Sequence, residues 1–483
     1  MPIDLSEENG GKTLAIHVTG KAAKVDFDHF VPEFERFASL HGKLRVLFDL
    51  TGFHGWEAGA LWDEIQFDIK HYADIERLAV VGDRKWQQGM AAFFKPFTKA
   101  TSRYFDHADA AEARKWLDET PRPTARPAQA NARALIETAR MLVADDKGLL
   151  AMDESNPTCD KRFAELGIPQ TEKARRAYRE LIVTTPGLGE CISGAILYDE
   201  TIRQSTTGGT PFIEVLAKAG IVPGIKVDTG AKDLAAFPGE KVTEGLDGLR
   251  DRLGTYFQMG ARFAKWRAVI ALGAEMPSRG CIEANAQALA RFAALCQEAG
   301  LVPVVEPEVL MDGDHTLEQC RQVTEEVLRT VFVQLCAQRV MLESMILKPN
   351  MVLPGLACLR QEAVGEVADV TVTCLLRTVP AAVPGIAFLS GGQSGELASA
   401  RLNAMNVRFK SRLPWAVAFS FARAIQHPAL EIWRGEEAHV PAAQMALYHR
   451  AACNRAARRG EYTAAMENVG TSQPVPAHSK PAA

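Results

Sequence analysis

Three lysines of the sequence, Lys226, Lys265 and Lys348, lie in segments that are otherwise apolar. Lys348 is the clearest case, because it follows the apolar run in "SMILKPNMV" at residues 344–352. Burying an unpaired ammonium group is costly, so a lysine that faces a core needs carboxylate partners or a lowered pKa. A deprotonated lysine forms a Schiff base with a carbonyl, and the protonated imine accepts electrons from a breaking bond. These lysines therefore predict carbon–carbon bond chemistry.

Three carboxylates follow apolar runs in the same way. Asp153 ends the segment "GLLAMD", and Glu306 and Glu308 lie in "LVPVVEPEVL". Carboxylates beside a reactive lysine can move the protons that carbinolamine formation and dehydration require. The competing interpretation is that the lysines form buried ion pairs or extend their charged ends to solvent. For one lysine both interpretations are equally good, whereas three lysines and three acids in matching positions favour a reactive site.

A phosphate site is predicted at "LSGGQS", residues 389–394. Ser390 offers a hydroxyl, and Gly391 and Gly392 offer open backbone N–H groups at a strand-to-helix turn. Arg423, on the next expected strand, adds a charged fork that suits phosphate. A Ser-Gly-Gly sequence alone is more often a plain turn, but its place just before the last strand favours phosphate binding.

The elements that must position these residues are eight apolar strands that alternate with amphipathic helices. This repetition predicts a (β/α)8 barrel, in which the active site lies at the carboxyl ends of the strands. A doubly wound open sheet is the competing architecture, and the charged strand ends favour the barrel. The expected strands are 148–153, 192–199, 222–228, 261–270, 301–310, 344–352, 385–392 and 414–424.

The first part of the chain predicts a small α/β sheet domain with strands at 13–20, 43–50, 77–83 and 102–106. Pro32 is expected in the first turn of the helix that follows the first strand, where its missing N–H costs little. A proline-rich stretch predicts a linker between the two parts. The expected division is an α/β domain at 1–120, a linker at 121–130, the barrel at 131–463 and a flexible tail at 464–483.

The composition excludes few classes of protein, but it indicates where the protein works and which partners it lacks. The 483 residues are 47% hydrophobic with a net charge of -4, which gives no reason to expect nucleic acid as a partner. Nine cysteines without a CxxC spacing indicate reduced thiols, and no signal peptide or membrane-length apolar run is seen. A cytoplasmic protein is expected. No HxH or HxxxH spacing occurs, so neither a metal site nor a cofactor is expected.

The second part resembles the class I fructose-bisphosphate aldolase family over about residues 131–463. The residues that carry the resemblance are "GLLAMDES", "GIKVDTG", "FAKWR", "VPVVEPEVLMDGDH", "LKPNMV", "FLSGGQS" and "WAVAFSFARA". The resemblance implies a metal-independent Schiff-base lyase, normally a tetramer. Such an enzyme reversibly cleaves fructose 1,6-bisphosphate to dihydroxyacetone phosphate and glyceraldehyde 3-phosphate in glycolysis and gluconeogenesis.

The resemblance also implies catalytic roles, by position within the matching motifs. Lys348 resembles the imine-forming lysine, and Lys265 resembles the lysine that assists carbinolamine formation and bond cleavage. Glu306 resembles the general acid and base, with Glu308 supporting it. Asp153 resembles the carboxylate that orients Lys348 and the substrate hydroxyls.

Substrate binding is implied in the same way for two phosphate groups and the sugar between them. The group near one phosphate is Ser390, Gly391, Gly392 and Arg423, and the residues near the other phosphate and the sugar are Ser155, Thr158, Arg162, Lys226 and Arg267. The chain departs from the family pattern at Phe421-Ala422, where Tyr-Gly is usual, and it lacks a terminal tyrosine. These departures motivate one alternative, an aldolase-like pseudoenzyme or scaffold that works through the first part of the chain. A further alternative is an aldolase that prefers another phosphosugar such as sedoheptulose 1,7-bisphosphate.

The first part resembles STAS-like domains, which are related to anti-sigma-factor antagonists, through "GFHGWEAGALWDEIQF" and "LAVVGDRKWQQGM". The resemblance implies a regulatory or targeting module with an unknown protein or lipid partner. Thr51 occupies a place where such domains are modified, although a turn or cap residue is the favoured interpretation.

Overall fold

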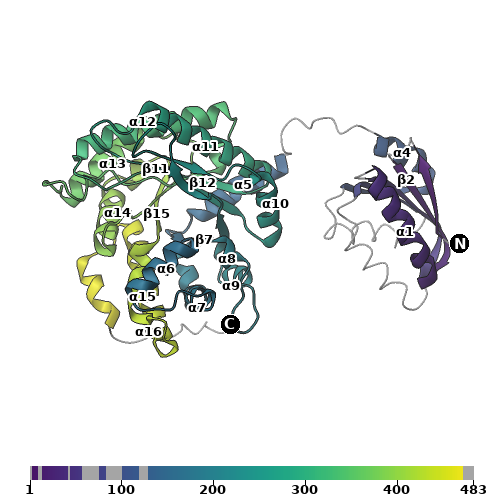
Figure 1. The fold of residues 1–483 in the computed structure, drawn as a ribbon, viewed down its shortest axis with the longest axis horizontal. Helices are drawn as coiled ribbons and strands as arrows, with labels where there is room; N and C mark the ends of the chain where they lie inside the picture. The colour runs from purple at the N-terminus through teal and green to yellow at the C-terminus, as the bar shows by residue number, and fades with distance from the viewer. Residues whose placement is uncertain are drawn as a thin grey trace. The chain divides into compact units, whose positions relative to one another are not determined.

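The chain forms two compact units, residues 1–125 and 126–483 (Figure 1). The computed structural model describes residues 3–8, 13–41, 44–56, 75–82, 101–118 and 129–471. Most of the expected linker and most of the "GFHGWEAGALWDEIQF" motif lie outside the described residues. Residues 129 and 130, which were expected in the linker, instead begin a helix of the second unit.

The first unit is a mixed sheet with the strand order β1-β2-β3-β4-β5, in which only β1 is antiparallel to its neighbour. Its strands are β1 (Ile3–Glu8), β2 (Thr13–Ala22), β3 (Leu44–Trp56), β4 (Ile75–Gly82) and β5 (Thr101–Asp106). Its helical segments are α1 (Lys24–His41), η3 (His107–Asp109) and α4 (Ala110–Asp118). The predicted α/β sheet is confirmed, while β1 was missed because its polar sequence shows little apolar alternation.

Alternate residues of each strand pack against opposite faces of this sheet. Leu14 and Val46 lie in one cluster with Phe34 of α1, and Leu47 lies in another with Leu117 of α4. The two helices therefore cover opposite faces, as the period of two along a strand requires. The expectation for Pro32 was wrong, because α1 begins at Lys24 and the exposed proline lies inside the helix.

The second unit is a closed barrel of eight parallel strands, so the predicted (β/α)8 architecture is confirmed. Its strands are β6 (Gly148–Ala151), β7 (Ile192–Leu197), β8 (Val222–Lys226), β11 (Phe263–Ile270), β12 (Val302–Val309), β13 (Ile346–Leu347), β14 (Gly385–Phe388) and β15 (Ala416–Phe421). Its helices are α5 (Gln129–Leu142), α6 (Asn156–Glu165), α7 (Glu172–Val183), α8 (Asp199–Ile202), α9 (Phe212–Lys218), α10 (Leu249–Met259), α11 (Arg279–Glu298), α12 (Leu317–Ala337), α13 (Val364–Thr378), α14 (Gly395–Phe409), α15 (Arg423–Trp433) and α16 (Val440–Arg459).

A hairpin that the sequence did not suggest follows β8, formed by β9 (Gly230–Asp233) and β10 (Lys241–Glu244). Short 3-10 segments complete the unit, namely η4 (Leu188–Glu190), η5 (Leu342–Ser344), η6 (Lys410–Arg412), η7 (Glu437–His439) and η8 (Ala464–Thr471). No described helix is long and apolar enough to cross a membrane.

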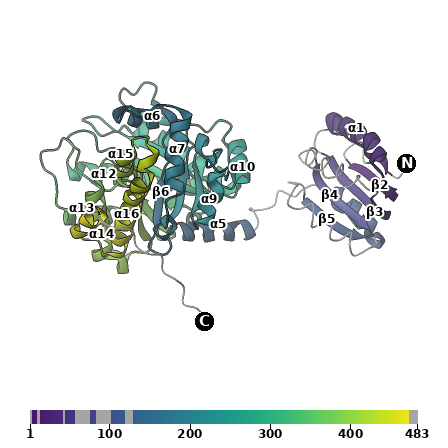
Figure 2. The ribbon, with the colours of Figure 1, turned by 90° about the horizontal axis from the view of Figure 1, so that it is seen from below.

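An apolar layer fills one end of the barrel. Leu149, Phe263 and Ile346 of three strands lie in one buried cluster with Leu135 and Leu142 of α5. Figure 2 shows α5 at one end of the barrel and α6 at the opposite end. Since α5 precedes β6 and α6 follows it, α5 closes the amino-terminal end, which leaves the carboxyl ends of the strands as the open face.

The first residues of the predicted tail are part of the folded second unit. Residues 464–471 form η8, and Glu467 of this segment pairs with Arg450 of α16 at 2.5 Å. The prediction of a flexible tail from residue 464 was wrong for this segment, because a contact with a residue outside it fixes its position. Residues 472–483 lie outside the described part of the chain.

Candidate active site

The barrel strands β11 and β12 change from apolar to charged residues along their inward faces. On β12, Val302 and Val304 lie in the apolar layer, and Glu306 continues the same face two residues later. On β11, Phe263 lies in that layer and Lys265 follows in the same way. Because side chains alternate along a strand, this spacing carries the charges to the open end of the barrel interior.

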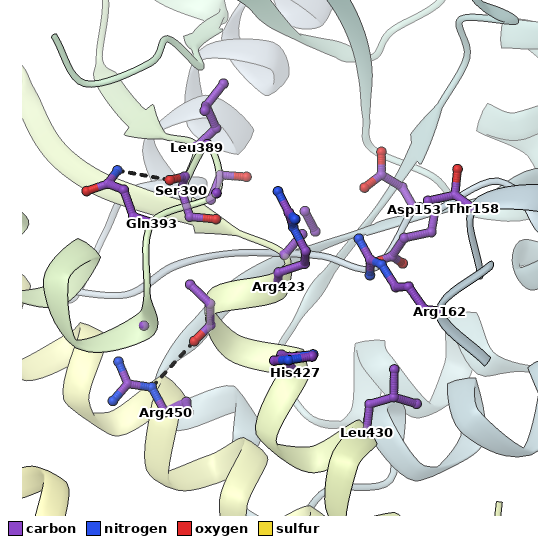
Figure 3. Close-up of a pocket in the computed structure, with 18 of the residues that line it drawn as sticks. Asp153, Thr158, Arg162, Leu389, Ser390, Gln393, Arg423, His427, Leu430 and Arg450 are labelled. Atoms are coloured by element: carbon purple, nitrogen blue, oxygen red, sulfur yellow. Dashed lines mark hydrogen bonds and ion pairs between the residues drawn. The ribbon is translucent and has the colours of Figure 1, made fainter. Parts of the chain in front are cut away.

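The predicted site residues meet at one cavity of about 930 Å³ at that end (Figure 3). All of them line it, from every part of the second unit: Asp153, Ser155, Thr158, Arg162, Lys226, Lys265, Arg267, Glu306, Glu308, Lys348, Ser390, Gly391, Gly392 and Arg423. The strand ends therefore bring together residues that are up to 270 positions apart in the chain.

The centre of the cavity is a chain of buried ion pairs. Lys265 Nζ lies 2.7 Å from Asp153 Oδ2 and 2.9 Å from Glu306 Oε2. The other oxygen of Glu306, Oε1, lies 3.1 Å from Lys348 Nζ. Glu306 thus bridges both lysines, and all of these side chains are at most 10% exposed.

Backbone contacts hold Lys348 in this chain although β13 ends one residue before it. The Lys348 N–H donates to Val305 O at 2.8 Å, and Pro349 O accepts from the Leu389 N–H at 3.1 Å. Asn350 Oδ1 accepts from the Val309 N–H at 3.0 Å. The segment after the strand therefore remains tied to β12, and Lys348 stays beside Glu306.

Neighbouring charges determine the pKa shifts of Asp153, Glu306 and Lys265. Burial would raise the pKa of Asp153, but Lys265, Lys348 and Lys226 outweigh it and hold this pKa well below its usual value. The pKa of Glu306 is likewise lowered, because the nearby cations outweigh burial. Burial would lower the pKa of Lys265, yet Asp153 and Glu306 raise it above its usual value. The two acids are therefore ionised and Lys265 is protonated at neutral pH.

Two further ion pairs flank the centre. Arg267 Nε lies 2.5 Å from Glu308 Oε2, and Lys226 Nζ lies 3.3 Å from Asp228 Oδ1. The Arg267 N–H also donates to Asp228 Oδ2 at 3.2 Å. In this arrangement Glu308 contacts Arg267, whereas Glu306 is the carboxylate that contacts both Lys265 and Lys348.

The loop after β14 has the backbone that the phosphate prediction requires. Gly391 and Gly392 have φ of 57° and 90°, a left-handed conformation that favours glycine. A Cβ on Gly392 would lie 3.5 Å from Arg423 Nη2, so the arginine lies next to this turn. The loop leads into the amino terminus of α14, whose dipole favours an anion. In Figure 3 Arg423 lies between Ser390 on one side and Arg162 on the other.

A second polar group lies on the other side, at the start of α6. Ser155 and Thr158 bring their hydroxyl oxygens within 3.0 Å of each other. Arg162 donates to Glu154 Oε1 at 2.5 Å, and Arg179 donates to Glu154 Oε2 at 2.8 Å. Glu154 was missed from the sequence, and its position after Asp153 was the one signal that could have pointed to it.

Gln393 and Arg450 also line the cavity and were not predicted. Gln393 Nε2 donates to Ser390 O at 2.9 Å, and its Oε1 accepts from Arg401 at 2.8 Å. The "GGQS" pattern placed Gln393 beside the phosphate loop, whereas Arg450 lies on α16 far from any motif.

The departure at Ala422 has little backbone consequence. Its φ is -106°, so this position does not need glycine. Ala422 packs against the apolar layer of the barrel and also lines the cavity.

The closed barrel and its paired lysines and carboxylates define a class of enzyme, the barrel lyases that act through a lysine imine. Comparison with known proteins agrees, since residues 134–479 match the family described as fructose-bisphosphate aldolase class-I. The chain belongs to the class-I fructose-bisphosphate aldolase family.

The second unit aligns with nearly the whole length of several named relatives. A probable fructose-bisphosphate aldolase class 1 of Xanthomonas campestris is 56% identical, covering 68% of this chain and 98% of that protein. The cytosolic fructose-bisphosphate aldolase 6 of Arabidopsis thaliana is 50% identical, over 68% of this chain and 92% of that protein. The solved aldolase of Plasmodium falciparum, in complex with TRAP and an inhibitor, superposes with a TM-score of 0.69 at 44% identity. It covers 70% of this chain and 97% of that chain.

Residues 13–118 match the family described as SpoIIAA-like, which confirms the STAS-like resemblance of the first unit. In this unit Thr51 lies within β3, so the interpretation of it as a turn or cap residue was wrong. The strand is irregular here, since the register to β2 shifts between His17 and Thr19. Thr51 Oγ1 donates to Asp49 Oδ1 at 2.6 Å and lies 3.1 Å from His107 Nδ1.

Proposed function

We propose that this chain reversibly cleaves fructose 1,6-bisphosphate to dihydroxyacetone phosphate and glyceraldehyde 3-phosphate through an imine on Lys348. The observation that carries the proposal is the bridge of Glu306 between Lys348 and Lys265 inside the barrel. This bridge supports the proposal, because Lys348 would be the nucleophile, Glu306 the proton carrier in contact with it, and Lys265 a fixed cation at the other oxygen of Glu306.

The chemistry follows from these contacts. Glu306, ionised at rest, accepts a proton from Lys348 Nζ, and the neutral amine adds to the substrate carbonyl as a second proton moves from nitrogen to oxygen. Glu306 then returns its proton to the carbinolamine hydroxyl, which leaves as water and yields the iminium. The iminium draws the electron pair of the breaking carbon–carbon bond while Glu306, ionised again, takes the proton of the hydroxyl on the leaving carbon, so that an aldehyde leaves and an enamine remains. Lys265 stabilises the negative charge that develops on oxygen, and Asp153 orients Lys265 and the substrate hydroxyls. Protonation and hydrolysis of the enamine release the second product and restore Lys348.

Two anion-binding groups support a bisphosphate substrate. The Ser390 loop with Arg423 and the start of α6 with Ser155 line the same cavity as the reactive lysine, and Figure 3 shows Ser390 and Thr158 on opposite sides of the view. Holding both ends of an open sugar chain between them would fix the bond that breaks. Comparing kcat/KM for fructose 1,6-bisphosphate and sedoheptulose 1,7-bisphosphate tests this preference, and a higher value for the longer sugar would favour the second substrate.

The direct test is borohydride trapping. The full chain is incubated with dihydroxyacetone phosphate and sodium borohydride, which reduces the imine to a stable secondary amine. Peptide mass mapping should then find the adduct on Lys348, with none when dihydroxyacetone phosphate is left out. Activity should persist in EDTA. An active chain without an adduct would exclude the imine mechanism, and an inactive chain that folds normally would favour the pseudoenzyme alternative.

Assembly and location form a separate part of the proposal. We infer a cytoplasmic homotetramer that needs no metal or other cofactor, supported by the family and by a relative named as cytosolic. Light scattering of the purified full chain should give four times the monomer mass of 52.7 kDa.

The first unit is proposed to regulate or target the enzyme through a protein or lipid partner. Its separation as a compact unit and its SpoIIAA-like match support a module distinct from the barrel. A chain that starts at Pro127 should be compared with the full chain in kcat/KM and in mass. Equal values would argue against regulation within the chain and would leave recruitment as its role.

A further inference from the structure

A buried arginine lies beneath both segments assigned to one phosphate. Arg450 of α16 is 3% exposed and borders the cavity. Its Nε donates to Ala424 O at 3.4 Å, in the first turn of α15 directly after Arg423. Its Nη2 donates to Ser399 Oγ at 2.8 Å, and this hydroxyl lies 2.9 Å from Gly395 O at the start of α14. One guanidinium therefore contacts the bases of both phosphate-binding segments.

The packing around this arginine leaves little free space. A Cβ on Gly395 would lie 3.0 Å from Ala424 O and 3.0 Å from Arg450 Nε. The start of α14, the start of α15 and Arg450 thus meet at close contact. Because interiors are close-packed, a displacement of Arg450 shifts both helix starts. Figure 3 shows Arg450 below Arg423 and Gln393.

The third side of the guanidinium is held by the C-terminal segment. Arg450 Nη1 lies 2.6 Å from Glu467 Oε1 and 2.5 Å from Oε2. Tyr462 donates its hydroxyl to Glu467 Oε1 at 2.7 Å. Glu467 belongs to η8, so the docking of this segment and the fixed position of Arg450 depend on the same ion pair.

We propose that Arg450 is a positioning residue for the Ser390–Arg423 phosphate site and that Glu467 of η8 locks it in place. The proposal rests on the proposed function, since it concerns one phosphate of that substrate. All three nitrogens of Arg450 have protein acceptors, so it acts through the backbone of α14 and α15 and does not itself bind phosphate.

A cation site is the competing interpretation of the same residues. His449 Nε2 lies 3.9 Å from Glu467 Oε2 and 3.6 Å from Cys453 Sγ, and these three side chains could hold a metal ion. However, Arg450 contacts both oxygens of Glu467, and its charge opposes a metal ion at the same carboxylate. The ion pair therefore argues for a protein clamp at this position.

The test separates position from charge. Arg450→Met should raise KM for fructose 1,6-bisphosphate about tenfold with a much smaller change in kcat. Arg450→Lys keeps the charge but cannot bridge three acceptors, so it should behave nearly like Arg450→Met. Calorimetric titration with inorganic phosphate should show the same loss of affinity without turnover.

Glu467→Ala gives the more decisive test, because the two interpretations predict opposite changes in phosphate affinity. Loss of a negative charge near an anion site would by itself tighten phosphate binding. The clamp predicts the opposite, a KM and a phosphate Kd raised several-fold, together with faster hydrogen exchange in residues 464–471. The double variant Arg450→Met/Glu467→Ala should be no worse than Arg450→Met, because both changes act through one contact.

Asp369→Asn is the matched control, since its ion pair with Arg408 at 2.7 Å joins α13 to α14 at the surface, away from the cavity. It should leave KM unchanged.

Wild-type affinity in Arg450→Lys, or tighter binding in Glu467→Ala, would overturn the positioning role. If the Arg450 variants fail to fold, Glu467→Ala decides the matter alone. Wild type without cleavage refutes the proposed function, whereas an active wild type with unaffected variants refutes only the clamp. EDTA that reproduces Glu467→Ala would favour a metal site.

Discussion

The barrel and the N-terminal sheet both carry polar residues at parallel strands, but the barrel encloses them and the sheet does not. In the barrel, the side chains of Lys265 and Glu306 are each 4% exposed. In the first unit His17 and Asp49, which lie 3.3 Å apart, are 36% and 22% exposed. The same elements therefore give a desolvated charge cluster in one unit and a half-exposed one in the other.

This difference teaches what barrel closure adds. An open sheet leaves its strand ends facing solvent on one side, where water screens the charges. A closed sheet turns eight strand ends toward a common axis, so each charge meets partners from other strands and loses most of its water. Interactions between such groups are stronger, and their ionisation depends on one another.

Lys348→Met should give the largest effect. Removal of the amine leaves no atom that can form the imine, so kcat should fall by at least about 10⁴-fold. Far-ultraviolet circular dichroism should remain that of the wild type, since Met matches the length of the lost stem. Steady-state cleavage assays and borohydride trapping check this outcome. Substantial residual activity would place the nucleophile elsewhere, with Lys265 the first candidate.

Glu306→Gln should come next, with kcat lowered about 10²- to 10³-fold. The amide keeps the shape of the side chain but cannot carry protons between Lys348 and the substrate. Glu308→Gln is the matched control on the same face of β12, because Glu308 contacts Arg267. It should alter KM more than kcat. Equal kcat losses in both variants would mean that the two carboxylates share the proton-transfer role.

Acid should lower the stability of the barrel through the protonation of Asp153. The lowered pKa of Asp153 gives stability that is present above the unfolded pKa of about 4 and is lost as pH falls toward the folded pKa. Asp153→Asn should cost the barrel about 3 kcal/mol at pH 7, because Lys265 keeps a buried charge with one partner fewer, and less at pH 3. Hydrogen exchange of β6 and β11 measures it. A cost that does not depend on pH would contradict an ionised Asp153.

The half-exposed cluster of the first unit should give the smallest effect. Thr51→Val removes the hydroxyl that donates to Asp49, at a cost of about 1 kcal/mol to this unit. Faster hydrogen exchange in β3 would report the loss. Cleavage should be unchanged in buffer, and a changed kcat/KM would show that the first unit communicates with the barrel.

The sequence was sufficient wherever local pattern determines structure. Apolar runs located all eight barrel strands, and the lysine at the end of the run "SMILK" lies in the cavity beside Glu306, as expected. The pairing within the site was not predictable to the same degree. That Glu306 bridges two lysines while Glu308 contacts Arg267 depends on the stagger of neighbouring strands.

The residues that sequence analysis missed depend on contacts between distant elements. Glu154 pairs with Arg179, which is 25 residues away on α7, and no spacing rule connects them. Arg450 and Glu467 meet only because α16 and η8 fold against each other. The strand β1 was missed because one antiparallel edge neighbour, rather than an apolar pattern, defines it.

The bridge made by Glu306 has a consequence for the whole reaction cycle. Asp153 and Glu306 bring two negative charges, which Lys265 and a cationic nitrogen at residue 348 offset. When the imine forms, a protonated iminium occupies the place of an ammonium, and Glu306 faces the same charge as before. The interior therefore remains close to electrical neutrality between resting and covalent states, and the surrounding protein dipoles need little rearrangement as the bond is made or broken.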